Sequence, residues 1–357
     1  MLLKTLTEVM GPSGFEDEIR DVIRQEVGAH VDRHYTDVLG SLICEKGIEK
    51  SGPKVLLDAH MDEVGLMIVH VEENGLLRFR PLGGVDPRVL VSKPVQIGTA
   101  KRYGVIGAKP IHLQSASERT QPLPLNKLFI DIGAKDKEDA LSVVQPGDVA
   151  VFTTKYEEIG EGCAKAKSFD DRVGCAVLVE TLKKTFDLPL YGAFTVQEEV
   201  GLRGAGPVAF RVQPDIAIAI EGTVCFDVVD APGHGQSTVL GQGPALTVYD
   251  AQTIADRRFL EFMMATAEKY NIPYQLRRVK GGSNDYGAIH KVRGGIVGGG
   301  ISVPVRYIHA PAQVISLEDY HNTIRLVSAI LTELAKGDSP HEGVRIGAGG
   351  AGRAVRF

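Results

Sequence analysis

The sequence predicts an α/β protein in which a mixed-sheet α/β domain is interrupted by a small inserted β-barrel-like domain. Strand-like apolar runs alternate with amphipathic helical patterns in residues 1–65 and again in 160–336. Residues 66–159 instead contain short alternating segments separated by Gly, Pro and Asp turns. A length of 357 residues suits two or three domains. Residues 337–357 are rich in Gly and Arg without periodicity, and we expect a flexible tail there.

The composition is that of an ordinary globular protein, with 43% hydrophobic and 24% charged residues. A net charge of −5 argues against a nucleic-acid partner. No apolar run approaches the roughly 20 residues of a membrane-spanning helix, and the first residues lack the apolar core of a signal peptide. We therefore expect no membrane association and a cytoplasmic location. The cysteines form no Cys-x-x-Cys pair, so we expect free thiols at Cys44, Cys163, Cys175 and Cys225.

The first α/β segment is predicted to begin with an amphipathic helix. Ser13 and Glu16 have capping-box spacing. Strand-like segments follow at 31–36, 41–44 and 54–57, and the last of these runs directly into residues 58–65. The helix has one apolar face made of Phe15, Ile19, Val22, Ile23 and Val27.

His60 and Asp62 lie where an α/β sheet usually carries its chemistry, beyond the carboxyl end of a strand. The His-x-Asp spacing puts both side chains on one face of an extended strand. A metal-binding imidazole commonly has a carboxylate behind it that fixes its tautomer. His60 is thus a candidate ligand and Asp62 its orienting partner. The alternative is a structural His that is hydrogen-bonded to a nearby Asp.

The inserted segment 66–159 has strand-like stretches at 76–80, 95–97 and 149–153, with helical periodicity only near 137–143. It contains His70 and His112, and we expect neither to act in catalysis. Because the two ends of an inserted domain lie close together, the segment can project as a separate lobe and meet a neighbour.

Asp170 and Asp171 stand at the start of the helix that resumes the α/β pattern. One interpretation is a helix cap, because carboxylates suit the positive end of the helix dipole. The other is that one of them bridges two metal ions, because a carboxylate can hold a cation with each oxygen.

Glu198 and Glu199 follow the strand-like run 188–194 and precede a glycine-rich turn. Like charges a few ångströms apart repel each other, and burial raises their pKa further. A divalent cation removes this conflict. The alternative is a solvated pair at the start of a surface loop.

Two more candidate ligands follow strand-like runs. Glu221 comes directly after the run 214–220, and His309 follows the glycine-broken run 295–303. Asp285, in a polar turn, either lines the site or is a plain turn residue. Two imidazoles and three carboxylates suit zinc, cobalt or manganese better than calcium. A shared carboxylate describes a two-metal hydrolase site with ions about 3.5–4 Å apart.

In this order, the motifs resemble the M42 metallo-aminopeptidases, which include glutamyl and tetrahedral aminopeptidases. The resemblance covers nearly the whole chain, from residue 13 to the last predicted helix at 316–334. The most specific motifs are Asp58-Ala59-His60-Met61-Asp62-Glu63-Val64-Gly65, Ser168-Phe169-Asp170-Asp171-Arg172, Gln197-Glu198-Glu199-Val200-Gly201, Leu240-Gly241-Gln242-Gly243-Pro244-Ala245 and Arg306-Tyr307-Ile308-His309.

The resemblance implies a catalytic domain of the di-zinc aminopeptidase type. It implies that His60, Asp170 and Glu221 hold one metal, and that Asp170, Glu199 and His309 hold the other. Glu198 matches the general base and Asp62 the residue behind His60. The sequence departs from the family at Glu221, where Asp is frequent, at Asp171, where some relatives have Asn, and at Ala310, where Ser is commoner. The longer side chain of Glu221 could alter metal preference.

The expected reaction is removal of the first residue from short peptides. The expected metals are two divalent ions per subunit, either zinc or cobalt, and manganese is the alternative. The resemblance also implies a homo-oligomer in which segment 66–159 forms dimers and six dimers form a tetrahedral dodecamer. The alternative is a dimer or monomer whose β domain shields the substrate groove. A carboxypeptidase or deacylase, an endoglucanase and a non-enzymatic shell protein are the competing functions. The preferred first residue is open, and an acidic one would require a pocket cation, for which Arg203, Arg306 and Lys280 are candidates.

Overall fold

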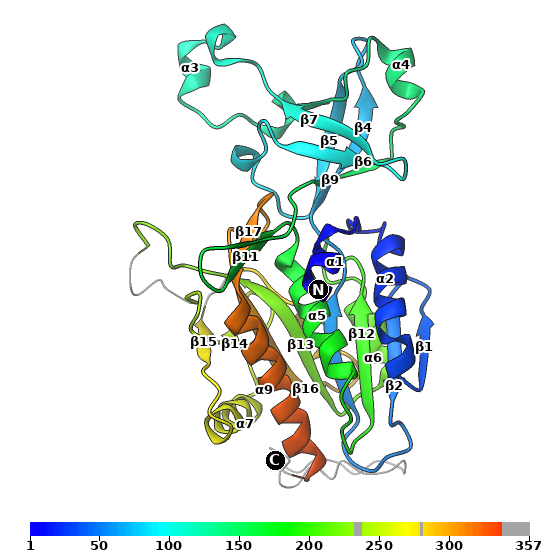
Figure 1. Cartoon of the computed structure of the whole chain (residues 1–357), viewed down its shortest axis with the longest axis vertical. Coiled ribbons are helices and arrows are strands. Elements are labelled where there is room, and N and C mark those ends of the chain that lie inside the picture. Colours follow the sequence, from blue (N-terminus) through cyan, green and yellow to red (C-terminus); the bar gives the residue numbers. More distant parts are fainter. Residues whose placement is uncertain (232–237, 279–280, 338–357) are drawn as a thin grey trace.

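The computed structural model describes residues 1–231, 238–278 and 281–337, so nearly all of the predicted tail lies outside the described residues. A large lobe is built on one sheet, and a smaller barrel lobe projects from one end of it (Figure 1). This α/β architecture with an inserted small barrel confirms the predicted fold class. Within the described ranges, none of the helices has the length and apolar character needed to cross a membrane.

The large lobe is organised around an 11-stranded mixed sheet. Its central strands are parallel: β3 pairs with β12 and β13, and β13 pairs with β16. Their carboxyl ends therefore meet at one edge, which faces the barrel lobe. The main order is β1 (Arg33–Thr36), β2 (Leu42–Lys46), β12 (Leu190–Thr195), β3 (Val55–His60), β13 (Ile216–Val224), β16 (Val297–Arg306), β17 (Gln313–Ser316), β11 (Cys163–Ala166) and β10 (Glu157–Ile159), with β14 (Ala245–Tyr249) and β15 (Gln275–Arg278) branching from β16.

Helices cover both faces of this sheet. Alternate residues of β13 face opposite layers: Ile216, Ile218 and Ile220 belong to one buried cluster, and Ala217 and Ala219 to another. The isoleucine face packs against α1 (Leu2–Glu8), α2 (Asp17–Val27), α5 (Phe169–Leu182), α7 (Arg257–Lys269) and α9 (Leu317–Ala335). The alanine face packs against α6 (Ala205–Val212) and α8 (Tyr286–Ile289).

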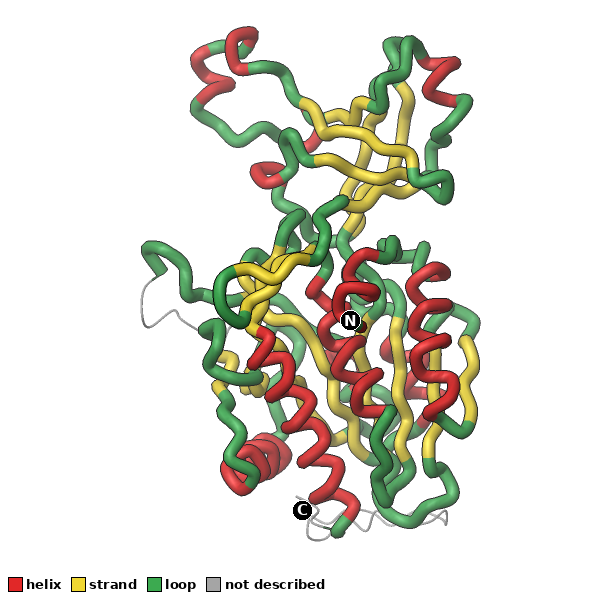
Figure 2. Tube along the Cα trace, viewed as in Figure 1, coloured by secondary structure: helices red, strands yellow, loops and turns green. Residues whose placement is uncertain are grey.

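The barrel lobe is a closed six-stranded barrel with its own buried core (Figure 2). Short alternating strands explain its closure, because one face of each strand fills the interior. In barrel order the strands are β4 (Gly65–Val71), β5 (Leu77–Leu82), β8 (Phe129–Asp131), β7 (Arg102–Gly107), β6 (Pro94–Ile97) and β9 (Val149–Phe152). The short helices of the barrel lobe are α3 (Ala116–Arg119) and α4 (Lys137–Leu141). It also contains the 3₁₀ turns η2 (Pro87–Val89), η3 (Ile111–Leu113) and η4 (Leu125–Lys127), whereas η1 (Gly28–His30) belongs to the large lobe.

The predicted division is a discontinuous catalytic domain, residues 1–65 with 160–336, and an inserted dimerisation domain, residues 66–159; we propose that it holds except at its second boundary. Because β9 ends at Phe152 and β10 pairs with β11 in the large sheet, we propose that the second boundary falls within 153–156.

Candidate metal centre

His60 is the last residue of β3, and its side chain is almost fully buried at the carboxyl edge of the sheet. Its Nδ1 lies 3.3 Å from a carboxylate oxygen of Asp62 and 3.2 Å from the Asp62 carbonyl oxygen. Because both oxygens are acceptors, the proton belongs on Nδ1. The other ring nitrogen, Nε2, therefore faces the centre of the site with its lone pair available.

Asp62 is a hydrogen-bond hub beside His60. The Ser13 hydroxyl donates to its Oδ2 over 2.6 Å, and the amides of Glu198 and Glu199 donate to its two oxygens over 3.0 and 3.2 Å. Burial alone would raise the pKa of Asp62, but its interactions with His60 and the hydrogen bonds from Ser13 and Glu198 outweigh burial and lower this pKa. Asp62 therefore orients His60 and fixes the turn that carries both glutamates.

The contact of Ser13 corrects one prediction. The capping box at Ser13 and Glu16 is not formed, because α2 begins at Asp17 and the Glu16 side chain makes no capping hydrogen bond. Glu16 instead accepts the amide of Gln197, immediately before Glu198, over 3.1 Å. Ser13 and Glu16 thus support the site rather than a helix terminus.

Asp170 lies at the start of α5, where two glycines allow close packing against β13. A Cβ on Gly174 would lie 2.5 Å from the Ile220 carbonyl oxygen, and a Cβ on Gly222 would lie 3.2 Å from the Cα of Asp170. The first distance excludes a Cβ unless the backbone shifts, and the second is a tight contact that a larger residue would strain. The glycines thus let the first turn of α5 approach the strand that carries Glu221.

Asp170 stands between two groups of candidate ligands. Its Oδ1 lies 3.3 Å from His60 Nε2, which is also 3.4 Å from Glu221 Oε2. Its Oδ2 lies 3.2 Å from His309 Nε2, which is also 3.2 Å from Glu199 Oε2. Each oxygen of Asp170 therefore belongs to a different imidazole–carboxylate group.

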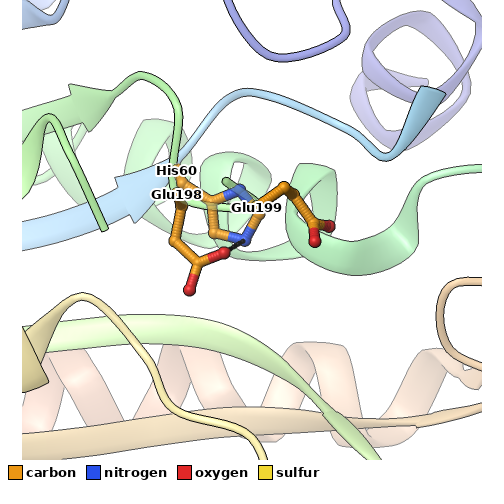
Figure 3. Close-up of side chains that lie close together, drawn as sticks. All are labelled: His60, Glu198 and Glu199. Carbon is orange, nitrogen blue, oxygen red and sulfur yellow. Dashed lines mark ion pairs between the residues drawn. The ribbon is translucent and has the colours of Figure 1, made fainter. Parts of the chain in front are cut away.

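Glu198 and Glu199 share the turn after β12 but direct their carboxylates differently. Glu198 Oε2 lies 3.8 Å from His60 Nε2, while Glu199 reaches His309. In Figure 3 the two carboxylates lie on different sides of His60. The preceding residue, Gln197, has a φ of 58°, in the left-handed region. This break from extended geometry lets both glutamates serve one pocket.

Two further acids lie behind this centre. Asp171 is near His60 and Glu221, and its Oδ2 is buried without a hydrogen-bond partner. The backbone amide of Asp285 donates to Glu221 Oε1 over 3.0 Å, and its carboxylate accepts the hydroxyl of Thr195 over 2.6 Å. Asp285 is therefore part of the site's support and not a plain turn residue.

The carboxylates raise one another's pKa. Burial, reinforced by neighbouring acids, raises the pKa of Glu198 and Glu221 well above the usual range, despite the opposing effect of His60. Burial and Asp170 raise the pKa of Glu199 to about 8, despite the opposing effect of His309. Burial would also raise the pKa of Asp170, but hydrogen bonds with His309 and His60 outweigh it and lower this pKa. The cluster thus holds more buried acids than its two imidazoles can neutralise.

The donor set fits divalent metal ions. Three groups of His and carboxylate side chains have ligand atoms within 4.8 Å of one another: His60 with Glu198 and Glu199, His60 with Asp171 and Glu221, and Asp170 with Glu199 and His309. Glu199 Oε1 is buried without a hydrogen-bond partner. Cations would supply the missing positive charge and an interaction for such oxygens, and a mixed nitrogen and oxygen set suits zinc, cobalt or manganese.

The barrel lobe also contributes to this centre. The carbonyl oxygen of Gly84, between β5 and η2, lies 2.9 Å from His309 Nδ1. A Cβ on Gly83 would lie 3.2 Å from the Cβ of Glu199. The loop from the barrel thus packs directly against two candidate ligands.

A cavity of about 540 Å³ opens beside the centre. Of the three cations named as pocket candidates, Arg203 and Arg306 do not line it, and Lys280 lies outside the described residues. Arg306 is instead paired with Asp227. Sequence reasoning missed Arg277, which does line the cavity. The sequence around Arg277 carries no local signal that this side chain faces a pocket.

Comparison with known proteins gives a consistent result. The family model described as M42 glutamyl aminopeptidase matches residues 40–326. The lysyl aminopeptidase of Pyrococcus furiosus is 30% identical, over 93% of this chain and 96% of that protein. The glutamyl aminopeptidase of Lactococcus lactis is 31% identical, over 93% of this chain and 95% of that protein.

Solved structures agree with the sequence matches. Aminopeptidase APDkam598 from Desulfurococcus kamchatkensis has a TM-score of 0.90 and 38% identity, covering 97% of this chain and 98% of that chain. The TET1 peptidase of Pyrococcus horikoshii, which can assemble into a tetrahedron or a large octahedral shell, has a TM-score of 0.84 and 35% identity, covering 93% and 98%.

Proposed function

This chain belongs to the M42 peptidase family and is an aminopeptidase, and we propose from this premise that it removes the first residue of short peptides at a two-metal centre with Glu198 as general base. The observation that carries the proposal is the position of Asp170, whose Oδ1 and Oδ2 lie 3.3 and 3.2 Å from Nε2 of His60 and of His309. A carboxylate placed between two imidazoles in this way suits a bridging ligand.

In this proposal, His60, Asp170 and Glu221 would hold one ion, and Asp170, Glu199 and His309 would hold the other. Asp62 keeps the proton of His60 on Nδ1 and thereby directs Nε2 to the ion. Zinc and cobalt are the proposed ions, with manganese as the alternative. Bound there, two divalent ions would polarise the scissile carbonyl and lower the pKa of an attacking water.

Residues of the chain would then transfer the proton and bind the substrate. Glu198 takes the proton of the attacking water and passes it to the leaving amine, as a positioned carboxylate can. The Asp62 carboxylate holds the Glu198 amide over 3.0 Å and so keeps this base in place. The acidic groups around the centre attract the free N-terminal amine of the peptide, which restricts cleavage to the first residue.

The test is a panel of aminoacyl p-nitroanilides on metal-stripped protein, with zinc, cobalt or manganese added back. We expect cleavage that a chelator abolishes and an added metal restores. The same substrates with an acetylated amine are the matched control and should not be cleaved. Cleavage of the blocked substrates, or of peptides from the carboxyl end, would contradict the proposal, as would no cleavage with any metal.

We also propose that the chain assembles through its barrel lobe, as a dimer-based tetrahedral dodecamer in the cytoplasm. The barrel lobe exposes apolar side chains that a neighbouring copy would cover: Tyr103 is 65% exposed, Ile111 66% and Leu113 61%. Enclosure would admit short or unfolded peptides and exclude folded proteins. Light scattering should give a multimer whose mass falls in a Leu113→Asp variant. A monomer with full activity would remove this proposal.

A further inference from the structure

We infer that Arg277 determines substrate specificity and selects peptides whose first residue has an acidic side chain. This inference rests on the proposed aminopeptidase function. Relatives named for a lysyl and for a glutamyl substrate are 30% and 31% identical to this chain, so overall similarity does not decide the preference. The residues that line the cavity have to decide it.

Arg277 lies beside the metal centre along one strand face. Glu221 and Thr223 are two residues apart on β13, so their side chains leave the strand on the same side. Nε of Arg277 donates to the Thr223 hydroxyl over 2.8 Å. The guanidinium therefore occupies the next position along β13 from the proposed ligand Glu221. A first residue bound at the metals can direct its side chain towards it.

The guanidinium of Arg277 is buried and incompletely paired. Only 5% of the residue is exposed. Nη2 donates to the carbonyl of Gly281 over 2.9 Å, but Nη1 is buried and has no hydrogen-bond acceptor among the described residues. A buried donor without a partner costs free energy. A carboxylate is the acceptor that best matches the planar guanidinium.

Asp250 is the nearest counter-charge, and it does not complete this pairing. Its Oδ2 lies 3.6 Å from Nη1 of Arg277, beyond hydrogen-bond distance. Its other oxygen accepts the amides of Gln252 and Thr253, each over 2.8 Å, and Oδ2 is 3.4 Å from the Asn284 amide nitrogen. Its charge is thus already shared with three donors. Arg277 keeps the capacity to bind a second carboxylate.

The other residues that line the cavity also favour an acidic first residue over a basic or an apolar one. Arg277 is the one Lys or Arg among the described residues that line it. A basic first residue would bring a second positive charge to Arg277, and an apolar one would leave Nη1 without an acceptor. An acidic side chain forms a charge-assisted hydrogen bond, which is roughly twice as strong as a neutral one. The apolar part of the wall is formed by Leu202, Val224, Phe226 and Ile308.

The experiment compares Glu-, Gln-, Leu- and Lys-p-nitroanilide on the metal-loaded wild type and on Arg277→Met. We expect kcat/KM of the wild type to be at least roughly 10-fold higher for Glu than for the isosteric Gln, because breaking a charged hydrogen bond typically costs about one power of ten or more. In Arg277→Met this ratio should fall to about one while Leu cleavage persists. Arg258→Met, on the exposed side of α7, is the matched control.

A second measurement does not depend on turnover. Free L-glutamate should raise the Tm of the wild type more than L-glutamine does, and Arg277→Met should lose this difference. If Arg277→Met does not fold, Arg277→Lys is the second variant. It retains the positive charge but lacks the paired N–H donors of the guanidinium, so the ratio of kcat/KM for Glu to that for Gln should be intermediate.

The possible failures are distinguishable. Absence of cleavage of every substrate overturns the proposed function and this inference with it. A wild type that prefers Leu or Lys, or Arg277 variants that lower all four rates equally, overturns the specificity inference alone.

Discussion

The carbonyl oxygen of Gly84 in the barrel lobe lies 2.9 Å from Nδ1 of His309 in the large lobe. Because a carbonyl oxygen can only accept, this contact puts the ring proton on Nδ1 and leaves Nε2 free to face Asp170 and Glu199. His309 also has a φ of 58°, an uncommon backbone conformation for a residue other than glycine. The inserted lobe therefore orients a candidate metal ligand in addition to any role in assembly.

The first prediction concerns this contact. A Cβ on Gly84 would lie 3.2 Å from His309 Nδ1, so Gly84→Ala should displace the ring. We expect metal affinity to fall by about 10–100-fold, the usual effect of losing an outer-shell partner. Titration with cobalt, followed by its visible spectrum, measures the affinity. Gly206→Ala, with open space around the Cβ, is the control. An unchanged cobalt titration would show that Gly84 does not orient His309.

The second prediction separates Asp170 from Asp171. If Asp170 bridges, Asp170→Ala should lose both ions, whereas Glu221→Ala should weaken mainly one. Asp171→Asn should keep two ions, because one Asp171 oxygen already accepts the Gly174 amide over 3.0 Å. Elemental analysis of the purified variants counts the ions, with the exposed Asp187→Ala as control. Two tightly held ions in Asp170→Ala would assign the bridge elsewhere, and Asp171 is then the next candidate.

The third prediction separates the two adjacent glutamates. Glu198→Gln should retain both ions but lower kcat by roughly 10²–10⁴-fold, the usual contribution of positioned proton transfer. Glu199→Gln should instead lose metal, because Glu199 contacts His309 over 3.2 Å. Parallel measurement of metal content and kcat distinguishes the two roles, with the exposed Glu49→Gln as control. Full turnover by a metal-replete Glu198→Gln enzyme would exclude Glu198 as the base.

The fourth prediction is a dependence of stability on pH. Burial, reinforced by Asp62, raises the pKa of Glu16 from 4.5 to about 7 in the folded protein. Between these values the folded state binds more protons than the unfolded state, so stability falls as pH rises. Glu16→Gln removes this effect. From pH 5 to pH 8, wild type should therefore lose unfolding free energy relative to Glu16→Gln.

Urea unfolding at the two pH values, with the same metal present, measures this difference. Glu18→Gln is the control, because Glu18 is two residues away in the first turn of α2 but pairs with Lys101 at the surface. A constant difference between wild type and Glu16→Gln across this range would mean that the Glu16 pKa is not raised.

Sequence reasoning identified the residues whose positions follow from strand direction. His60 ends β3 and Glu199 follows β12, and the carboxyl ends of these parallel strands meet at one edge. Glu221 was predicted to follow its strand, but it lies within β13, which continues to Val224. The inserted barrel was predictable for a similar local reason, because its turns recur at short intervals. These features depend on patterns within a single segment.

The residues that sequence reasoning missed depend on contacts between distant segments. Gly84 reaches His309 only because the barrel lobe folds back onto the large lobe. Arg277 lines the cavity only because β15 joins the large sheet through β14. Ser13 has capping-box spacing, yet its hydroxyl donates to Asp62, 49 positions away. No local sequence pattern encodes such contacts. The residues that support the candidate ligands and those that line the cavity therefore could not be predicted from the sequence.

The insertion of the barrel within the large lobe also sets when activity can arise during synthesis. β3 pairs with β12 and β13, which are translated only after the whole barrel. The proposed ligands extend from His60 to His309, so the last of them is synthesised long after the first. At roughly 5–20 residues per second, a ribosome needs tens of seconds for the interval. A nascent chain therefore has no complete centre before His309 has been synthesised, and peptide hydrolysis cannot begin earlier than that.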